Sequence, residues 1–593
     1  MKFIDEKLHR SLSIIISLIG IFLQYYYYNS IYVYNNISIF LLIILMISLN
    51  NLLYMMLYPN KINNNLFLLL FTSFSFNILY SYYSRNFNYI PPLDAIYHRK
   101  ISEAIIINGK LNMYAYNTQM ENDYSSYPGF HLILGITSLV TGCNSIYVTK
   151  FIPIIYTVMP FIMYFISKNI FISNRISLIS AFIVTFPPKW YSFPSYSRFV
   201  FIFVLFLLYS IVQYQIKKKN EYLFLILIFS FCISITHHIT NYIMIGLFTF
   251  ILVSNKILRL VENKIQIFIP NFNVEYVKTD IFMILIIVNI IYPIYSAFIA
   301  TNFHLNLLLK FLSPYYIPES FSISIMGSYY AFEKYFIFAI LILVGCIGIL
   351  GFLKYIFKER SNILLVSIII FFGLMTIVAI PLMYVNTIIM DYVQYRLVFI
   401  IFIFISPFVG YAINEFMSIP NKKYLNYIKT IIIVLVFLGF SYSTVKLVPQ
   451  SYYNFSQEES SGYLWDVRGY SNSLHRTLLW MSEQYQLRDD NPIAIGDTPI
   501  KSIGNGMYDL NVKYYWDVYE RPLNESEVNT LIRRIKADYV FFDALLLDYK
   551  QQPSFAVFVD SIPLSQVDYL MNCDWLNKVY DNGVFMVFHV IQR

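Results

Sequence analysis

The stretch Phe199-Val-Phe-Ile-Phe-Val-Leu-Phe-Leu-Leu-Tyr-Ser-Ile-Val-Gln-Tyr-Gln-Ile216, followed by Lys217-Lys218-Lys219, decides the fold class. It carries no charge before its lysines, and its length approaches the roughly 20 residues that a helix needs to cross a bilayer. Similar apolar runs recur along the chain from Ser11 to Val445. The sequence therefore predicts a polytopic α-helical membrane protein.

The composition of the whole chain agrees with this prediction. Of its 593 residues 58% are hydrophobic and only 13% are charged, whereas soluble domains carry about 25% charged residues. A soluble cytoplasmic enzyme is excluded. Of the 4 cysteines only Cys573 lies outside the apolar region, which excludes a disulfide scaffold. The net charge of +8 needs no nucleic-acid partner, because the cations sit in short loops between apolar runs.

The positions of the basic residues predict the topology. Lys2, Lys7 and Arg10 place the N-terminus in the cytoplasm. The basic clusters of later loops lie on that same side only if the apolar stretch His131–Gly142 does not cross the membrane. This stretch is too short to span a bilayer, so we expect that it does not cross. The result is a multi-pass protein of the cell membrane, in contact with membrane lipid, with about thirteen transmembrane helices.

Two regions follow from this topology. Residues 1–447 form the transmembrane part, with residues 83–130 as its first large outer loop, and residues 448–593 form an extracytoplasmic α/β domain. In the latter, Pro492–Asp497 has the pattern of a buried strand and Lys578–Val590 that of a hairpin.

The first outer loop holds a carboxylate and an imidazole at helical spacing, in Pro91-Pro92-Leu93-Asp94-Ala95-Ile96-Tyr97-His98. Side chains at i and i+4 share a helix face, so Asp94 and His98 can address one ligand. A carboxylate at a membrane-edge cavity can act as a general base towards an alcohol. The alternative, equally favoured by the spacing, is that Asp94 caps a helix running to Asn108.

An acidic outer loop followed by Tyr127-Pro-Gly-Phe-His131 resembles the GT-C membrane glycosyltransferases, above all the archaeal and bacterial relatives of dolichyl-phosphate-mannose protein mannosyltransferases. The resemblance implies a sugar donor on a polyprenyl phosphate, an acceptor hydroxyl on a glycan, lipid or protein, and Asp94 as the catalytic base. We expect inversion at the sugar, with His98 beside Asp94 in the catalytic site.

The chain also departs from that family. Many relatives pair two acidic residues, but Ala95 and Ile96 follow Asp94 and the nearest acid is Glu103, so no metal is assigned. The Trp-Trp-Asp signature of oligosaccharyltransferases is absent, which disfavours transfer of a whole oligosaccharide. No nucleotide-binding glycine loop occurs, and we expect no cofactor.

A lipid-phosphate donor needs cations or hydrogen-bond donors at the outer face. Candidate substrate-binding residues are Arg396, Arg198, His131, His237 and His238. For Arg396 we favour phosphate binding, and for Arg198 an interfacial anchor. The adjacent histidines either bind substrate or are satisfied within their turn, and they point too far apart to share one metal ion.

Three other functions stay open. A secondary transporter or lipid-linked sugar flippase would carry ionisable residues at mid-membrane, which the helix centres here avoid. A polymerase of lipid-linked sugars would use a late outer loop. A non-catalytic relative would tolerate the missing second acid beside Asp94.

Overall fold

The structure is a computed structural model. It describes residues 6–28, 37–85, 93–108, 127–185, 196–268, 274–275, 279–299, 331–358, 361–362, 367–368, 370–371, 374, 387–418, 429–437, 472–486, 492–495, 510–513, 530, 532–534, 536–543, 574, 576–581 and 585–591.

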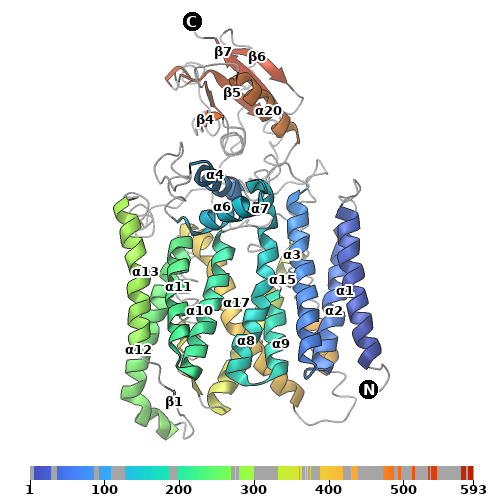
Figure 1. Ribbon diagram of the computed structural model, residues 1–593, viewed down its shortest axis with the longest axis vertical. Coiled ribbons are helices and arrows are strands. Elements are labelled where there is room, and N and C mark those ends of the chain that lie inside the picture. The colour runs from blue at the N-terminus through green and yellow to red at the C-terminus, as the bar shows by residue number, and fades with distance from the viewer. Residues whose placement is uncertain are drawn as a thin grey trace.

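The axes of the described helices are roughly aligned, so that the helices form a bundle (Figure 1). They are α1 (Glu6–Tyr28), α2 (Ile37–Leu57), α3 (Ile62–Arg85), α8 (Met159–Phe171), α9 (Asn174–Thr185), α10 (Tyr196–Lys217), α11 (Asn220–Thr236), α12 (His238–Phe268), α13 (Thr279–Ile299), α15 (Ala331–Lys358) and α17 (Thr387–Ser418). The stretch from Phe199 to Ile216 lies within α10, as predicted. Of the thirteen expected crossings, those near residues 363–378 and 428–447 fall partly outside the described residues.

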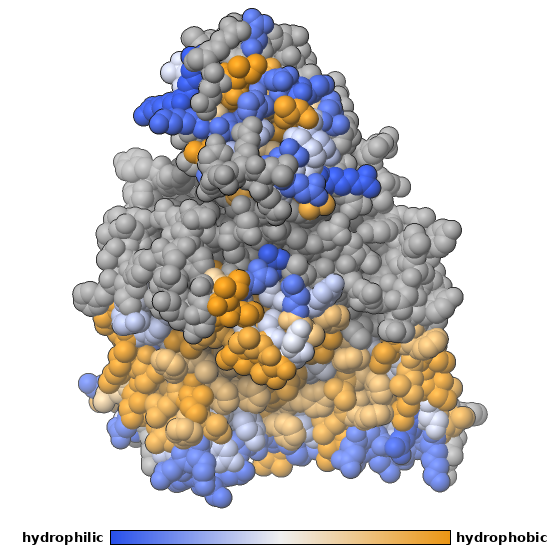
Figure 2. Space-filling model, turned by 45° about the horizontal axis from the view of Figure 1, so that its top comes forward, coloured by the Kyte–Doolittle hydropathy of each residue, from blue (hydrophilic) through white to orange (hydrophobic). Residues whose placement is uncertain are grey.

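The bundle has the surface of a membrane protein. In the described residues, 4 helical stretches are long and apolar enough to cross a bilayer: Tyr147–Phe171, Arg198–Lys217, His238–Ile257 and Thr279–Ser296. Figure 2 shows an apolar band across the visible face of the bundle, with hydrophilic residues below it. The prediction of a helical membrane protein is confirmed.

The first three helices are joined by polar side chains. Asn51 of α2 donates to Ser17 Oγ of α1 at 3.1 Å and to Thr72 Oγ1 of α3 at 2.9 Å. Asn50 donates to Ser13 Oγ of α1 at 2.7 Å. Since lipid tails are as apolar as leucine, interhelical hydrogen bonds of this kind hold membrane helices together.

Glycines allow other helices to approach closely. At Gly351 of α15 a Cβ would overlap the backbone carbonyl of Phe408 in α17. At Gly410 of α17 a Cβ would lie 2.7 Å from the carbonyl oxygen of Ile176 in α9. These contacts place α17 between α9 and α15, in the way that small residues promote packing of membrane helices.

At one end of the bundle lie α4 (Leu93–Asn108), α6 (Gly129–Thr141) and α7 (Ser145–Phe151) (Figure 1). A short 3₁₀ segment, η2 (Ile152–Val158), joins α7 to α8. α4 and α6 lie across the bundle end, so the stretch His131–Gly142 does not pass through the bundle. Its helix spans only about 20 Å at 1.5 Å per residue.

Beyond α4 and α6 lies a mixed sheet (Figure 1). The order of its 5 strands is β4-β3-β5-β7-β6, with β3 parallel to β4 and β5, and β7 antiparallel to β5 and β6. Its elements are α20 (Asn472–Gln486), β3 (Ile493–Ile495), β4 (Asn511–Lys513), β5 (Tyr539–Asp543), β6 (Leu576–Asp581) and β7 (Phe585–Val590). The predicted strand and hairpin are β3 and β6–β7.

A second, small pair of strands lies at the opposite end of the bundle, the end at which α1 begins. There β1 (Val274–Glu275) runs parallel to β2 (Ser361–Asn362). The sheet of residues 493–590 and the start of α1 therefore lie at opposite ends of the bundle (Figure 1).

Candidate functional site

Two buried histidines join α4 to α6. His98 Nδ1 lies 2.7 Å from His131 Nε2, and both residues are only 1% exposed. The ring of Phe130 meets the His98 ring edge-on at 5.5 Å. Farther along both helices, a Cβ at Gly135 would lie 3.6 Å from the carbonyl oxygen of Ser102. The two helices therefore run side by side in the same direction.

Burial makes this pair neutral near neutral pH. It lowers the pKa of His131 to about 3. The pKa of His98 is also well below its usual range, first because of burial and second because of the neighbouring His131. Since each neutral imidazole carries one proton, one ring donates across the contact and the other accepts. Both rings serve as a contact between helices, with little surface left for a ligand.

The start of α6 packs against the junction of α11 and α12. A Cβ at Gly129 would overlap Thr236 Oγ1 and lie 3.2 Å from the carbonyl oxygen of Ile235. The ring of Tyr127 lies 5.0 Å from that of His238. Burial raises the pKa of the Tyr127 phenol far above its usual value, so the phenol stays protonated.

His237 caps α12. The backbone N–H of Thr240 donates to His237 Nδ1 at 3.2 Å, and Thr240 Oγ1 lies 2.7 Å from the same nitrogen. A side-chain acceptor for an N–H of the first turn is what a helix N-terminus requires. Of the two alternatives for this residue, the structure favours a histidine satisfied within its turn.

Arg198 is buried at the start of α10, with an exposure of 2%. Its Nη2 donates to Asn77 Oδ1 of α3 at 3.3 Å, and its guanidinium carbon lies 4.1 Å from the ring centroid of Tyr156. The next residue, Phe199, packs against Phe130 of α6 at 5.5 Å. The sequence favoured an interfacial anchor for Arg198, whereas in the structure the cation is buried and an amide and an aromatic face hold it.

Glu103, the acid nearest to Asp94 in the sequence, interacts with Arg99 and Ser145. Its carboxylate forms an ion pair with Arg99 Nη2 at 3.1 Å, and Ser145 Oγ of α7 donates to its second oxygen. This network ties α4 to α7. Among the described side chains of α4, Glu103 is the one carboxylate, so it does not supply a second acid beside Asp94.

The remaining predicted residues are placed through their helices. Asp94 lies in the first turn of α4, four residues before His98, and the helix runs to Asn108 as expected. Arg396 lies in the N-terminal part of α17. The side chains of both residues lie outside the described part of the structure. No group of three or more potential metal ligands occurs among the described residues.

Sequence reasoning missed two residues that hold this region together, Asn77 and Tyr156. An asparagine within the apolar helix α3 is the kind of intramembrane polar residue that indicates a function, and that signal was present for Asn77. Tyr156 lies in one of the apolar runs, and hydropathy does not separate it from the other tyrosines of those runs.

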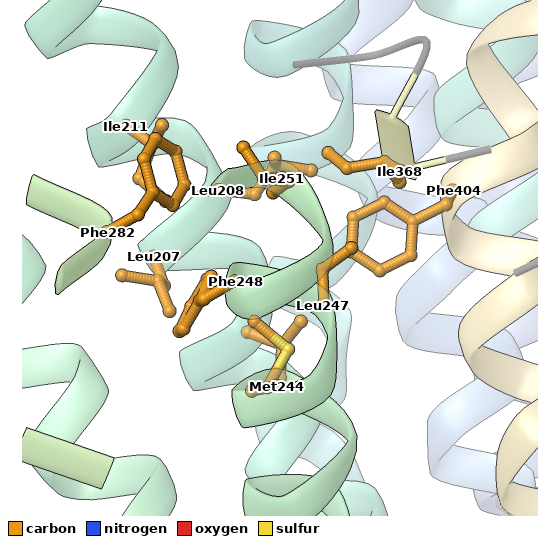
Figure 3. Close-up of a pocket in the computed structure, with 11 residues that line it drawn as sticks. Leu207, Leu208, Ile211, Met244, Leu247, Phe248, Ile251, Phe282, Ile368 and Phe404 are labelled. Atoms are coloured by element: carbon orange, nitrogen blue, oxygen red, sulfur yellow. The ribbon is translucent and has the colours of Figure 1, made fainter. Parts of the chain in front are cut away.

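A cavity in the middle of the bundle is of a different kind (Figure 3). All of its lining residues are apolar, and they come from α10, α12, α13 and α17 among others, including Leu207, Met244, Phe248, Phe282 and Phe404. Without a polar group it offers a sugar no hydrogen bond, so the candidate site is the end of the bundle beneath α4 and α6.

Comparison with solved structures shows which known proteins share this fold. No family model and no curated protein matches the chain. The crystal structure of the Archaeoglobus fulgidus oligosaccharyltransferase tethered with an acceptor peptide containing the NVT sequon aligns with a TM-score of 0.51 and 13% identity, over 88% of this chain and 74% of that chain. The chain has the fold of the archaeal oligosaccharyltransferase.

Two further structures of the archaeal enzyme agree. Its complex with Zn and sulfate aligns with a TM-score of 0.51 and 14% identity, over 88% of this chain and 73% of that chain. The complex of AglB from the same organism with an inhibitory peptide and a dolichol-phosphate aligns with a TM-score of 0.50 and 13% identity, over 86% and 74%. The resemblance to GT-C membrane glycosyltransferases is thereby confirmed at the level of the fold.

Proposed function

We propose that the chain is a membrane glycosyltransferase that transfers a sugar from a polyprenyl-phosphate donor to an acceptor hydroxyl at the outer face of the membrane. The observation that carries the proposal is a convergence at one end of a GT-C-like bundle. There α4, which bears Asp94, packs on α6, and the start of α6 packs on the start of α10 and on the junction of α11 and α12.

In this proposal Asp94 is the base. Its carboxylate accepts the proton of the acceptor hydroxyl, whose oxygen attacks the anomeric carbon and forms the new glycosidic bond. The bond from that carbon to the phosphate oxygen breaks, and polyprenyl phosphate leaves with the electron pair. Attack opposite the leaving group inverts the configuration. Because His98 is buried against His131, we assign His98 to holding α4 in place and not to contact with the substrate.

Cations on neighbouring helices would receive the leaving phosphate. Arg396 on α17 is the first candidate, since its guanidinium offers a fork of donors suited to phosphate. The dolichol-phosphate bound in one archaeal neighbour supports a polyprenyl donor, and the acceptor peptide in another makes a peptide the first acceptor to test. His238 is a candidate for a substrate contact, and we assign the buried Arg198 and His131 to supporting the site.

The proposed topology places the N-terminus in the cytoplasm and residues 448–593 outside, after about thirteen crossings. Support comes from the opposite positions of the start of α1 and the sheet of residues 493–590 (Figure 1). The exposed lysines Lys217, Lys218 and Lys219 between α10 and α11 also belong to the N-terminal side of the bundle, as the positive-inside rule requires of a cytoplasmic face.

The test is sugar transfer from radiolabelled polyprenyl-phosphate donors in membranes that contain the wild type or Asp94→Asn at equal amounts. Asp94→Asn keeps the shape and removes the base, and we expect transfer to fall at least a hundredfold, the lower range for a general base. Asp280→Asn at the start of α13, an exposed carboxylate at the opposite bundle end, is the matched control and should transfer normally. Equal transfer by the wild type and Asp94→Asn would refute the role of Asp94.

A further inference from the structure

The contact between α4 and α6 contains two titratable groups facing each other. His98 Nδ1 and His131 Nε2 are 2.7 Å apart, and both residues are 1% exposed. The distance is that of a hydrogen bond with one shared proton. His131 Nδ1, on the other side of its ring, is buried and has no hydrogen-bond partner. A proton added to this ring would therefore gain no acceptor there.

Among the described side chains, the charged groups around the pair do not favour extra protons. On α4, the positive charge of Arg99 is balanced by Glu103. α7 contributes the hydroxyl of Ser145 to that same carboxylate. From α10, the buried guanidinium of Arg198, held by Asn77 and Tyr156, is a further positive charge. α12 reaches the start of α6 through His238, whose ring packs on Tyr127.

Two protonated rings cannot keep this geometry. Each nitrogen at the contact would then carry a hydrogen, so donor would face donor and two positive charges would lie within a few ångströms of each other. A single added proton preserves the hydrogen bond but buries a charge. Both protons are accommodated far better if α4 separates from α6 and the rings reach water.

We propose that the His98–His131 pair is a pH-sensitive latch, which holds α4 on α6 while both rings are neutral and releases α4 on acidification. The latch itself is a property of the fold. Its effect on catalysis rests on the proposed function, because α4 carries Asp94, and release would remove the base from the site.

The size of the effect follows from proton linkage. In the released state each imidazole has an ordinary pKa of about 6.5, whereas in the latched state it stays neutral to a much lower pH. The released state therefore binds more protons, and latching weakens as the pH falls below 6.5. At one pH unit below that value the latching equilibrium falls about tenfold for each ring, or roughly a hundredfold for the pair.

A distance measurement between the two helices tests the latch. Spin labels are attached to Ile107→Cys on α4 and Leu139→Cys on α6, which are 80% and 62% exposed. The native cysteines are replaced by serine in the full chain, reconstituted in nanodiscs. At pH 7.5 we expect one short distance. Between pH 6.5 and 5 a longer, broader population should appear.

Two variants isolate the pair. The double variant His98→Gln with His131→Gln keeps hydrogen-bonding side chains that do not titrate, and its distance should be independent of pH. His9→Gln replaces a buried histidine of α1 at the other end of the bundle and should respond like the wild type. An unchanged wild-type distance down to pH 5 would overturn the latch. So would the same pH response in the double variant.

Sugar transfer measured at pH 7.5 separates this inference from the proposed function. If the distance between the labels increases on acidification but no sugar is transferred, the latch is supported and the transferase is refuted. If sugar is transferred but the distance between the labels does not change with pH, the transferase is supported and the latch is refuted.

Discussion

Replacement of Gly129 by alanine tests how tightly the start of α6 must fit. The new Cβ would overlap Thr236 Oγ1 and lie 3.1 Å from Ile235 Cγ1 and 3.2 Å from the Ile235 carbonyl oxygen. The hydroxyl can turn away only by giving up its 2.6 Å bond to the carbonyl of Cys232. The backbone carbonyl cannot turn away, so α6 or the end of α11 must shift.

Overpacking of this kind costs about 1–3 kcal/mol. The lost hydrogen bond adds about 1 kcal/mol. The gain in helix propensity from glycine to alanine offsets at most about 1 kcal/mol. We therefore expect Gly129→Ala to destabilise the protein by about 1–3 kcal/mol, seen as a lower midpoint of thermal unfolding in detergent.

The same helix supplies the control. A Cβ at Gly135 meets its neighbours at 3.6–3.8 Å, which is ordinary van der Waals contact, so Gly135→Ala should be neutral or mildly stabilising. Thr236→Ala removes the overlapping hydroxyl, and combined with Gly129→Ala it should recover about 1 kcal/mol as a coupling energy. If Gly129→Ala unfolds at the same temperature as Gly135→Ala, the close packing of α6 on α11 is refuted.

Two further substitutions test the interior of the bundle. Asn77→Leu removes the hydrogen-bond acceptor of the buried guanidinium of Arg198. It should destabilise the protein by about 1.5–3 kcal/mol in the same thermal assay. An unchanged unfolding midpoint would show that Asn77 does not hold Arg198. Gly351→Ala should lower the folded yield and the unfolding midpoint, because its Cβ would overlap the backbone of Phe408. Gly345→Ala is the control and should leave both unchanged, because the space around its Cβ is open. Equal behaviour of the two glycine variants would contradict the contact between α15 and α17.

The helices of the bundle were predictable because hydropathy is a local property. An uncharged apolar run such as Phe199–Ile216 has few alternatives to a membrane helix, and it lies within α10. The hairpin of β6 and β7 was equally local, since its turn signal stands between its strands. β4 lacks such a signal, because Asn511–Lys513 is short and polar apart from Val512.

The contacts of the candidate site were not predictable in the same way. His98 and His131 were both candidates, but nothing in the residues between them sets the register of α4 on α6. Asn77 and Arg198 are 121 positions apart, and only the packing of α3 against its neighbours brings them together. Arg198 was expected at the interface because hydropathy reports where a helix ends and not which way its terminal side chain turns.

The hydrogen bonds among Ser17, Asn51 and Thr72 have a consequence for biogenesis. All three partners belong to the first three helices, so the amide of Asn51 finds its partners as soon as α3 has entered the membrane, before α8 has been synthesised. An unsatisfied amide in hydrocarbon is costly, and early pairing spares the chain that cost during insertion. The first three helices can thus assemble as a unit during translation.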